Sequence, residues 1–443
     1  MSANRRQYTQ GNRGLELDGL QEGSLTCFPP APEEPTILIR RPVLALLVLA
    51  LTAAVACSSE PDATEPSTAA TTLVPASTEP APTTTAPPTV TIRGASFRGD
   101  LSDQLVAVYS VAMGMPGELR ADDLLVEHIS SAGLASEDRE ISVEFSAAGA
   151  FEKRVGVVVA GDDVILATRE IDGTDWTIIG ASLPSLGLEP WFGADSHQLF
   201  IIGSDARTPQ DPLMLRADSL HIVSVAPDGS SASIVGIPRD SWVETPYGGS
   251  NKITNIMAGR GPEAVTQAAE DRSGVEFDGY IVTAFAGFVR LVNDLGGLTI
   301  DIPFAMNEPK SDAFFDAGVQ MIDGSQALAF ARNRTLAGGD LTRSFHQGVL
   351  MQWGLLALQE QGPLAIPLFL DALDKHTFTN LTAEQLMLVT AAALAQEDPL
   401  QVPNLVVPAS VGSVGSASVV FLGDGATAVF TDLQDGVLDT APE

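Results

Sequence analysis

Charged side chains gather in the loops of one part of this 443-residue chain, and their types suggest a specific chemistry. Arginine and aspartate recur together in the short motifs "GSDAR", "LRADS" and "PRD", each of which stands where an apolar run begins or ends. Three later motifs, "NKIT", "ARNR" and "GGDLTRSFHQ", add further basic residues. The candidate site residues in these motifs are Asp205, Arg207, Arg216, Asp218, Arg239, Asp240, Lys252, Arg332, Arg334 and Arg343.

These residue types fit a diphosphate held together with a divalent cation. Arginine stays charged, and its planar fork matches phosphate oxygens in a bidentate fashion. The carboxylates of Asp205, Asp218 and Asp240 are hard oxygen ligands of the kind that Mg²⁺ shares with phosphates. The opposing interpretation is that any single Arg-Asp pair is a surface ion pair of little energetic value. A diphosphate-binding site is favoured only because several such motifs recur in the loops of one segment. In that site Arg239 would be a phosphate clamp.

Other chemistries find less support. Two cysteines, Cys27 and Cys57, exclude a disulfide scaffold and a multi-cysteine zinc site, and no two of the five histidines share a helix-turn spacing. The chain has neither a G-x-S-x-G elbow nor a P-loop. A formal net charge of -32 argues against nucleic acid as a partner.

Strands and helices alternate from Gln198 onward, and these elements must position the charged loops. The pattern predicts an α/β fold with a central mixed sheet covered by helices on both faces. Ligands of such sheets bind outside the strand ends, so we expect the loops to converge on one crevice. Expected strands include "QLFIIG", "SLHIVSVAP", "SASIVGIP", "LTIDIP", "LQVPNLVVPA", "SASVVFLG" and "ATAVFTDL", and expected helices include "GPEAVTQAAEDRSG", "GSQALAFAR", "TRSFHQGVLMQWGLLALQEQG" and "TAEQLMLVTAAALAQ".

Two features of this segment leave alternatives open. An apolar stripe that includes Phe285, Phe288 and Leu291 fits core packing, and the sharper alternative is a pocket for a lipid chain. His346 lies near Arg343 in the sequence and is expected on a helix surface, whereas His221 lies inside an apolar strand and is expected in the core.

The residues before the α/β segment divide into three parts. Residues 1–57 form an N-terminal extension followed by "RRPVLALLVLALTAAVACSS", which fits a lipoprotein-like signal with Cys57 as the lipidated residue; a short membrane anchor is the alternative. Residues 58–91 are a Pro/Thr/Ser tract typical of an extended linker, and residues 92–188 are predicted to be a small β-rich accessory region. The α/β domain with its C-terminal extension then spans 189–443. Either form of anchor places the bulk of the chain outside the cytoplasm, on a bacterial cell membrane.

The order of motifs resembles the LytR-CpsA-Psr family. "LFIIGSDAR", "RADSLHIVSVAPDGSSASIVGIPRDSWVE", "NKITNIMAGRGPEAV", "IDGSQALAFARNR" and "GDLTRSFHQGVLM" carry the resemblance, which covers about Leu199 to Leu358. It implies an extracytoplasmic phosphotransferase that moves a glycopolymer from a polyprenyl-diphosphate carrier to peptidoglycan through a phosphodiester. The alternatives are a non-catalytic protein that binds polyprenyl phosphate or wall polymer, and a secreted polyprenyl pyrophosphatase.

The resemblance also implies roles for individual residues. Asp205 and Asp218 match the carboxylates associated with Mg²⁺ (or Mn²⁺), and Arg239 matches the central clamp. Asp205 or Asp240 is the candidate general base. The chain departs from the family at His346 and in "NIMAGRGP", where an aromatic-rich stretch is usual. The residues that match the diphosphate-binding positions are Arg207, Arg216, Lys252, Arg332, Arg334, Arg343 and Gln347.

Overall fold

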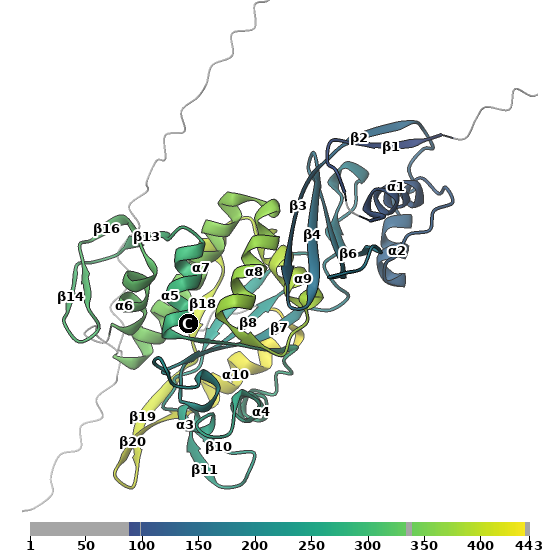
Figure 1. Ribbon diagram of the computed structural model, residues 1–443. Helices are drawn as coiled ribbons and strands as arrows, with labels where there is room; N and C mark the ends of the chain where they lie inside the picture. The colour runs from purple at the N-terminus through teal and green to yellow at the C-terminus, as the bar shows by residue number, and fades with distance from the viewer. Residues whose placement is uncertain (1–87, 98, 334–338, 439–443) are drawn as a thin grey trace, which may run out of the picture. The chain divides into compact units, whose positions relative to one another are not determined.

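The computed structural model describes residues 88–97, 99–333 and 339–438 (Figure 1). These residues all belong to one compact unit. The predicted signal or anchor with Cys57, nearly all of the predicted linker, and Arg334 lie outside the described residues.

A six-stranded mixed sheet forms the centre of the α/β part, in the order β17-β12-β7-β8-β9-β18. Strands β7, β8 and β9 are antiparallel neighbours, β12 is parallel to β7, and β18 is parallel to β9. The carboxyl ends of β7, β9 and β12 and the start of β8 therefore lie at one edge of the sheet. The strands are β7 (His197–Ser204), β8 (Ala217–Val225), β9 (Ala232–Gly236), β12 (Gly279–Ala284), β17 (Phe378–Thr379) and β18 (Asn404–Val406).

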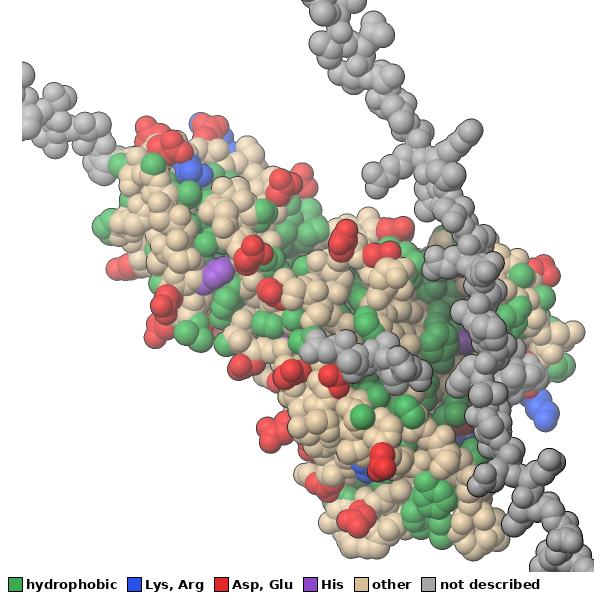
Figure 2. Space-filling view, turned by 180° about the vertical axis from the view of Figure 1, so that it is seen from behind, with side chains coloured by type: hydrophobic (Ala, Val, Ile, Leu, Met, Phe, Trp, Pro, Cys, Tyr) green, Lys and Arg blue, Asp and Glu red, His purple; other side chains and the backbone are tan. Residues whose placement is uncertain are grey.

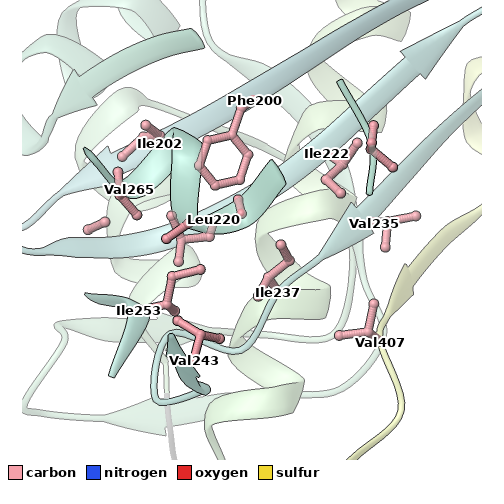
Figure 3. Packing of buried hydrophobic residues seen from close by; sticks show 14 of the residues in the cluster. Phe200, Ile202, Leu220, Ile222, Val235, Ile237, Val243, Ile253, Val265 and Val407 are labelled. Atoms are coloured by element: carbon pink, nitrogen blue, oxygen red, sulfur yellow. The ribbon is translucent and has the colours of Figure 1, made fainter. Parts of the chain in front are cut away.

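Successive side chains of a strand point to opposite faces of the sheet, so every second residue lies on the same face. Phe200 and Ile202 of β7 point to one face, where they pack with Leu220, Ile222 and Val235 in a fully buried cluster (Figure 3). Three helices cover this face, namely α3 (Ile253–Ile256), α4 (Pro262–Ser273) and α10 (Asp424–Asp432). This side of the sheet is an ordinary close-packed core.

The opposite face carries Leu199, Ile201 and Val223, and helices from two parts of the chain lie over it (Figure 1). These helices are α5 (Phe285–Asp294), α7 (Asp340–Gln361), α8 (Ile366–His376) and α9 (Ala383–Leu394). Helices thus lie on both faces of a central mixed sheet, which confirms the predicted fold class.

A smaller lobe packs beside α7 around its own buried cluster. Its helix α6 (Gly324–Arg332) begins with a capping box, in which Asp323 and Gln326 exchange side-chain and backbone hydrogen bonds. This cap fixes the start of the helix whose last residue is Arg332. The strands of the lobe are β13 (Leu298–Ile302), β14 (Met306–Glu308), β15 (Ala313–Phe315) and β16 (Gly318–Ile322), and two hairpins elsewhere join β10 (Trp242–Glu244) to β11 (Ser250–Lys252) and β19 (Ala409–Val414) to β20 (Ala417–Leu422).

The region before the central sheet contains a four-stranded antiparallel meander and two helices over a separate buried cluster. The strand content agrees with a β-rich region, and the boundaries at 92 and 188 stay predictions, since β1 already begins at Val90. The elements are β1 (Val90–Arg93), α1 (Leu101–Ala112), α2 (Asp123–Ser130), β2 (Arg139–Ser142), β3 (Glu144–Ala150), β4 (Lys153–Ala160), β5 (Asp163–Glu170) and β6 (Thr177–Ser182).

One expected strand is wrong. "ATAVFTDL" falls almost entirely in helix α10, whose buried residues are Ala426, Val429 and Phe430. Together with the buried Leu433 directly after the helix, they follow the i, i+3, i+4, i+7 spacing of a helix. Its Thr, Val and Phe content had favoured a strand. Helix α8 was not expected at all.

The face turned away from the viewer of Figure 1 carries scattered acidic side chains and few basic ones, as Figure 2 shows. This distribution agrees with the acidic composition of the chain. Among the residues that the structure describes, no helix combines the length and the apolar character needed to cross a membrane.

Candidate active site

The motifs at the strand ends come together at one edge of the central sheet. Asp205 directly follows β7, Asp218 is the second residue of β8, and Arg239 follows β9. Asp218 therefore stands at the start of its strand rather than at its end, because the β7–β8 hairpin brings that start to the same edge. The mixed sheet thus brings the site residues to one edge, as the carboxyl ends of parallel strands do in a doubly wound fold.

Backbone hydrogen bonds hold Arg239 in a tight turn beyond β9. The Ser241 N–H donates to the Pro238 carbonyl at 2.9 Å, and the Arg239 carbonyl accepts from the Thr254 N–H at 3.0 Å. Helix α7 comes close to this turn because Gly236 has no side chain: a Cβ there would lie 2.5 Å from Ser344 Oγ. The glycine therefore lets the first turn of α7 reach Arg239.

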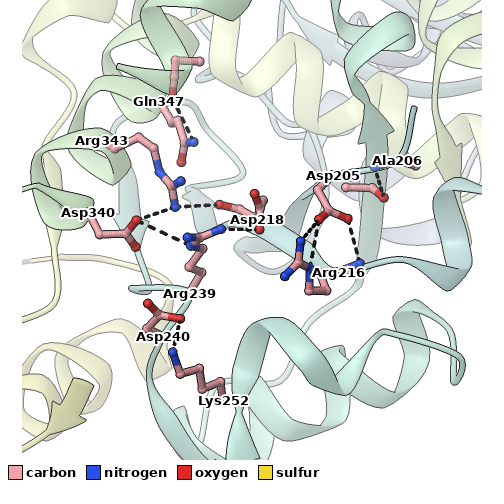
Figure 4. Close-up of polar contacts among 12 residues, drawn as sticks. Asp205, Ala206, Arg216, Asp218, Arg239, Asp240, Lys252, Asp340, Arg343 and Gln347 are labelled. Carbon is pink, nitrogen blue, oxygen red and sulfur yellow. Dashed lines mark hydrogen bonds and ion pairs between the residues drawn. The ribbon is translucent and has the colours of Figure 1, made fainter. Parts of the chain in front are cut away.

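Four charged residues form a closed ring at this point (Figure 4). Arg239 Nη1 donates to Asp218 Oδ1 at 2.6 Å, and Arg239 Nε lies 3.5 Å from Asp340 Oδ1. Arg343 Nη2 lies 2.8 Å from the same Asp340 oxygen and donates to the Asp218 carbonyl at 3.3 Å. Burial disfavours the charge on Arg239, yet the carboxylates of Asp218 and Asp340 outweigh it and raise the pKa of Arg239. The ring is thus a fixed, charged unit.

A second ion pair joins Asp205 to Arg216. Arg216 Nε and Nη2 donate to Asp205 Oδ2 at 2.9 and 2.6 Å, and the Arg216 N–H donates to Asp205 Oδ1 at 3.1 Å. The Asp205 side chain is 13% exposed and the Arg216 side chain 56%, so this pair reaches the surface.

Arg207, Arg332 and Gln347 complete the set on the cavity wall. Gln347 donates to the Ala331 carbonyl at 3.2 Å, and the Arg332 guanidinium lies over the Phe285 ring at 5.1 Å from its centroid. Within the described residues neither Arg207 nor Arg332 forms an ion pair, so both guanidinium groups retain donors for an anion. We call the following residues the polar cluster: Asp205, Arg207, Arg216, Asp218, Arg239, Arg332, Arg343 and Gln347.

Asp240 and Lys252 lie beside this cluster and not on the cavity wall. Lys252 Nζ lies 3.0 Å from Asp240 Oδ1, and Lys252 pairs with Trp242 across the β10–β11 hairpin. Lys252 was expected to bind phosphate, and Asp240 was expected to accept a proton. In this structure they neutralise each other immediately behind Arg239.

The polar cluster is continuous with an apolar cavity of about 1210 Å³ between the sheet and its second helical layer. Leu199 and Asp205 both line it, and six residues of strand span about 20 Å. The cavity therefore runs the length of β7 from a charged end to an apolar one. Its apolar lining includes Ile201, Val223, Ile281, Leu291, Leu355, Phe369, Leu386 and Val389.

The apolar stripe of α5 is explained by this cavity. Phe285, Phe288 and Leu291 all line it, and each is only partly buried by protein atoms. The lipid-pocket interpretation of the stripe therefore agrees better with the structure than the core interpretation does.

The two histidines near the site are both buried. His221 is fully buried and contacts the Ser344 carbonyl at 3.0 Å through Nε2, as expected for a core residue. The expectation of a surface position for His346 is wrong, because its ring stacks on Phe330 with centroids 4.8 Å apart and is 5% exposed. Burial lowers the pKa of each histidine to about 4, so neither is charged at neutral pH.

The oxygen ligands fit a metal ion that arrives with phosphate. Across the described part of the chain, no three His, Cys, Asp or Glu side chains gather as metal ligands. Asp205 and Asp218 both line the cavity, however, and Mg²⁺ often uses one or two carboxylates together with substrate phosphates. Each carboxylate is bound to an arginine here, and a diphosphate would compete for that arginine.

Three functional candidates were not found from the sequence. Asp340 lies three residues before Arg343, and that helical spacing was the available signal for an ion pair. Glu308 and Lys310 also line the cavity, although nothing in "NEPKSD" indicated it.

Fold and site together define a class of protein: a mixed α/β domain in which arginines and carboxylates stand at the charged end of a long apolar cavity. A model of the LytR_cpsA_psr family matches residues 192–432, more than half of the chain. The chain belongs to the LytR_cpsA_psr family.

Individual relatives are similar over shorter stretches. The cell wall biosynthesis protein LcpA of Corynebacterium glutamicum is 29% identical over 231 residues, which cover 42% of this chain and 45% of LcpA. The polyisoprenyl-teichoic acid–peptidoglycan teichoic acid transferase TagV of Bacillus subtilis is 31% identical over 128 residues, which cover 27% of this chain and 32% of TagV. The chain thus spans less than half the length of these two relatives. The crystal structure of B. subtilis TagV superposes with a TM-score of 0.49 at 22% identity over 56% of this chain and 100% of that one.

Proposed function

We propose that this chain is an extracytoplasmic phosphotransferase. It transfers a glycopolymer from a polyprenyl-diphosphate carrier to a hydroxyl group of peptidoglycan and forms a phosphodiester. The observation that carries the proposal is the continuity of the polar cluster with the apolar cavity, since a polyprenyl diphosphate has one charged part and one long apolar part. The names of LcpA and TagV, a cell wall biosynthesis protein and a teichoic acid transferase, agree with it.

The reaction exchanges one phosphorus–oxygen bond for another. The acceptor oxygen attacks the phosphorus that carries the glycopolymer, and the bond from this phosphorus to the bridging oxygen breaks. The products are the glycopolymer phosphodiester, the polyprenyl phosphate and one proton. Phosphoryl transfer depends on positioning and charge neutralisation more than on covalent help, which is what fixed guanidinium groups supply. Arg239 is held among them by ion pairs to Asp218 and Asp340.

Asp205 and Asp218 would hold Mg²⁺ or Mn²⁺ in this scheme. The ion would neutralise charge on the diphosphate and on the leaving phosphate. When phosphate oxygens bind Arg216 and Arg239, the two carboxylates lose partners that they have in Figure 4 and gain the capacity to coordinate a cation.

A carboxylate is the candidate acceptor of the proton from the attacking hydroxyl. Asp205 lies on the cavity wall, whereas Asp240 lies off it and is paired with Lys252. We therefore favour Asp205 as the general base and assign Asp240 the supporting role of fixing Lys252 behind Arg239.

The proposed location follows from the substrates. Peptidoglycan and a membrane-borne carrier meet at the outer face of the cell membrane. An N-terminal anchor, with Cys57 lipidated or the apolar run inserted, would hold the chain there, and the Pro/Thr/Ser tract would set its distance from the bilayer.

The test is an incubation of the purified chain with a polyprenyl-diphosphate saccharide, Mg²⁺ and a peptidoglycan acceptor. We expect a saccharide–peptidoglycan phosphodiester and polyprenyl phosphate in equal amounts. Hydrolysis to polyprenyl phosphate without transfer would instead identify a pyrophosphatase. Binding of the carrier without any phosphate chemistry would identify a binding or regulatory protein.

A further inference from the structure

A tyrosine and an arginine from two different loops stack face to face on the surface. The Arg260 guanidinium lies 3.6 Å from the centroid of the Tyr247 ring. Tyr247 is 43% exposed, and Arg260 is exposed as well. We call these two residues the Tyr247–Arg260 stack. Arg260 falls in "NIMAGRGP", the stretch in which the sequence departs from the family.

Hydrogen bonds fix both loops. In the β10–β11 turn, the Thr245 N–H donates to the Gly249 carbonyl at 2.9 Å, and Thr245 Oγ1 donates to the Gly248 carbonyl at 2.8 Å. Both glycines have positive φ, 90° and 76°, which side chains other than glycine rarely adopt. On the other loop, the Arg260 N–H donates to the Met257 carbonyl at 3.0 Å. The backbone that carries both residues of the stack is therefore fixed before any ligand arrives.

Two short connections join the stack to the polar cluster. The first runs along the β10–β11 hairpin from Tyr247 to Lys252, which is paired with Asp240 next to Arg239. The second runs through the Gly259 N–H, which donates to the Met214 carbonyl at 3.1 Å, two residues before Arg216. The stack is thus connected to both ion-pair groups of the site while lying outside the cavity wall.

The guanidinium of Arg260 retains its hydrogen-bond donors. Within the described ranges it forms neither an ion pair nor a side-chain hydrogen bond, although acidic residues outnumber basic ones by 56 to 24. By contrast, Arg216, Arg239 and Arg343 each bind a carboxylate. A stacked guanidinium presents its donors at the edge of the plane, where hydroxyl or anionic oxygens can accept them.

We propose that the Tyr247–Arg260 stack is a carbohydrate-binding subsite. A pyranose ring has a face of C–H groups that packs against an aromatic ring, and hydroxyl or carboxylate oxygens at its edge that accept from arginine. The proposal rests on the proposed function for the source of the sugar. That source is either the first saccharide units of the donor or the glycan strand of the acceptor, both of which must extend outward from the reacting phosphorus.

Equilibrium binding by calorimetry on the full chain tests the proposal without turnover. The probes are a short-chain prenyl-diphosphate disaccharide, the same prenyl diphosphate without sugar, and a soluble peptidoglycan glycan fragment. Tyr247→Ala and Arg260→Ala are expected to weaken binding of one saccharide probe about fivefold and to leave the sugarless probe unchanged. Tyr247→Phe keeps the ring and should bind nearly as the wild type does. The matched control is Phe314→Ala, which removes a 57% exposed aromatic ring in β15.

Loss of affinity for the disaccharide donor assigns the subsite to the donor, and loss for the glycan fragment assigns it to the acceptor. The proposal is overturned if both alanine variants bind both saccharides like the wild type, or if they lose the sugarless probe equally. Unchanged thermal unfolding of the variants excludes misfolding as the cause. Since no step requires transfer, a failure of the proposed reaction would leave these binding results intact, and transfer that is indifferent to both variants would count against the subsite alone.

Discussion

Asp340 bridges Arg239 and Arg343 through a single carboxylate oxygen, which lies 3.5 Å from Nε of the first and 2.8 Å from Nη2 of the second. The two arginines come from a loop and from a helix that are a hundred residues apart in sequence. Asp340, whose side chain is 26% exposed, thus joins them directly, and Asp218 joins them a second time through its carboxylate and its backbone carbonyl.

Asp340→Asn should lower turnover roughly tenfold, because a neutral amide holds two guanidinium groups less firmly than a carboxylate. Stability should change little, since Arg239 keeps Asp218 and Arg343 keeps the Asp218 carbonyl. Steady-state kinetics and thermal unfolding measure the two effects. Asp371→Asn, which removes an exposed ion pair with Lys375 on α8, is the control. Wild-type turnover in Asp340→Asn would show that the bridge has no role in positioning.

Arg239→Ala should reduce transfer below detection while the fold is retained. The substitution removes the central donor of the ring and leaves Asp218 and Asp340 without their shared partner, so we also expect a loss of about 1–3 kcal/mol in the free energy of unfolding. Urea titration and the transfer assay distinguish the two losses. A folded Arg239→Ala variant with substantial activity would refute the clamp role.

Gly354 offers a way to fill the cavity without a clash. It lies in α7 and lines the cavity, and a Cβ built there meets no heavy atom within 4 Å. Gly354→Leu should weaken binding of a long-chain polyprenyl phosphate by about tenfold or more, since the added side chain occupies the same space. Gly354→Ala is the matched control: it should stabilise the helix by about 0.5–1 kcal/mol and bind the lipid almost normally. Equal lipid affinity in both variants would place the chain elsewhere.

His346 should make the protein less stable in mild acid. Burial holds its pKa at about 4, and an unfolded histidine titrates near 6.5, so the unfolded state takes up a proton first as the pH falls. The free energy of unfolding should therefore decrease between about pH 6.5 and pH 4. His346→Phe keeps the stacking on Phe330 and should flatten this dependence by up to about 3 kcal/mol. An identical slope in the variant would show that other groups carry the effect.

Removal of divalent cations should stop transfer and leave lipid binding intact, because the apolar lining needs no metal. Asp218→Asn should raise the Mg²⁺ concentration required for half-maximal activity. Asp240→Asn should leave that Mg²⁺ concentration unchanged, because the Asp240 carboxylate does not line the cavity. Turnover that resists a chelator would argue against a role of the cation.

Much of the fold could be predicted from local sequence patterns, and the failures have physical causes. Strands such as β7 and β8 are short apolar runs between turn residues, which a pattern of that length indicates well. Helix α10 was mistaken for a strand because its β-branched and aromatic residues concealed a helical spacing of buried positions. Propensity is a weak guide where packing decides the outcome.

The candidate site could be predicted only in part from the sequence. The residue types of the polar cluster were found, since arginine next to aspartate at strand ends is visible in the sequence. Their pairing was not, because Asp205 binds Arg216 across a hairpin and Asp218 binds Arg239 across two strands. The apolar cavity next to them exists because side chains from several helices and the sheet leave a space between them, and no single residue of the sequence indicates such a space.

The cavity along β7 also has a consequence for how a catalytic cycle would end. In the proposed reaction the prenyl tail is identical before and after transfer, so the apolar wall would bind spent carrier as tightly as fresh carrier. Discrimination between the two would then depend on the guanidinium groups, which would contact two phosphates in fresh carrier and one in spent carrier. Departure of the used lipid, rather than bond exchange, would accordingly govern the pace of such an enzyme, and free polyprenyl phosphate would be its natural inhibitor.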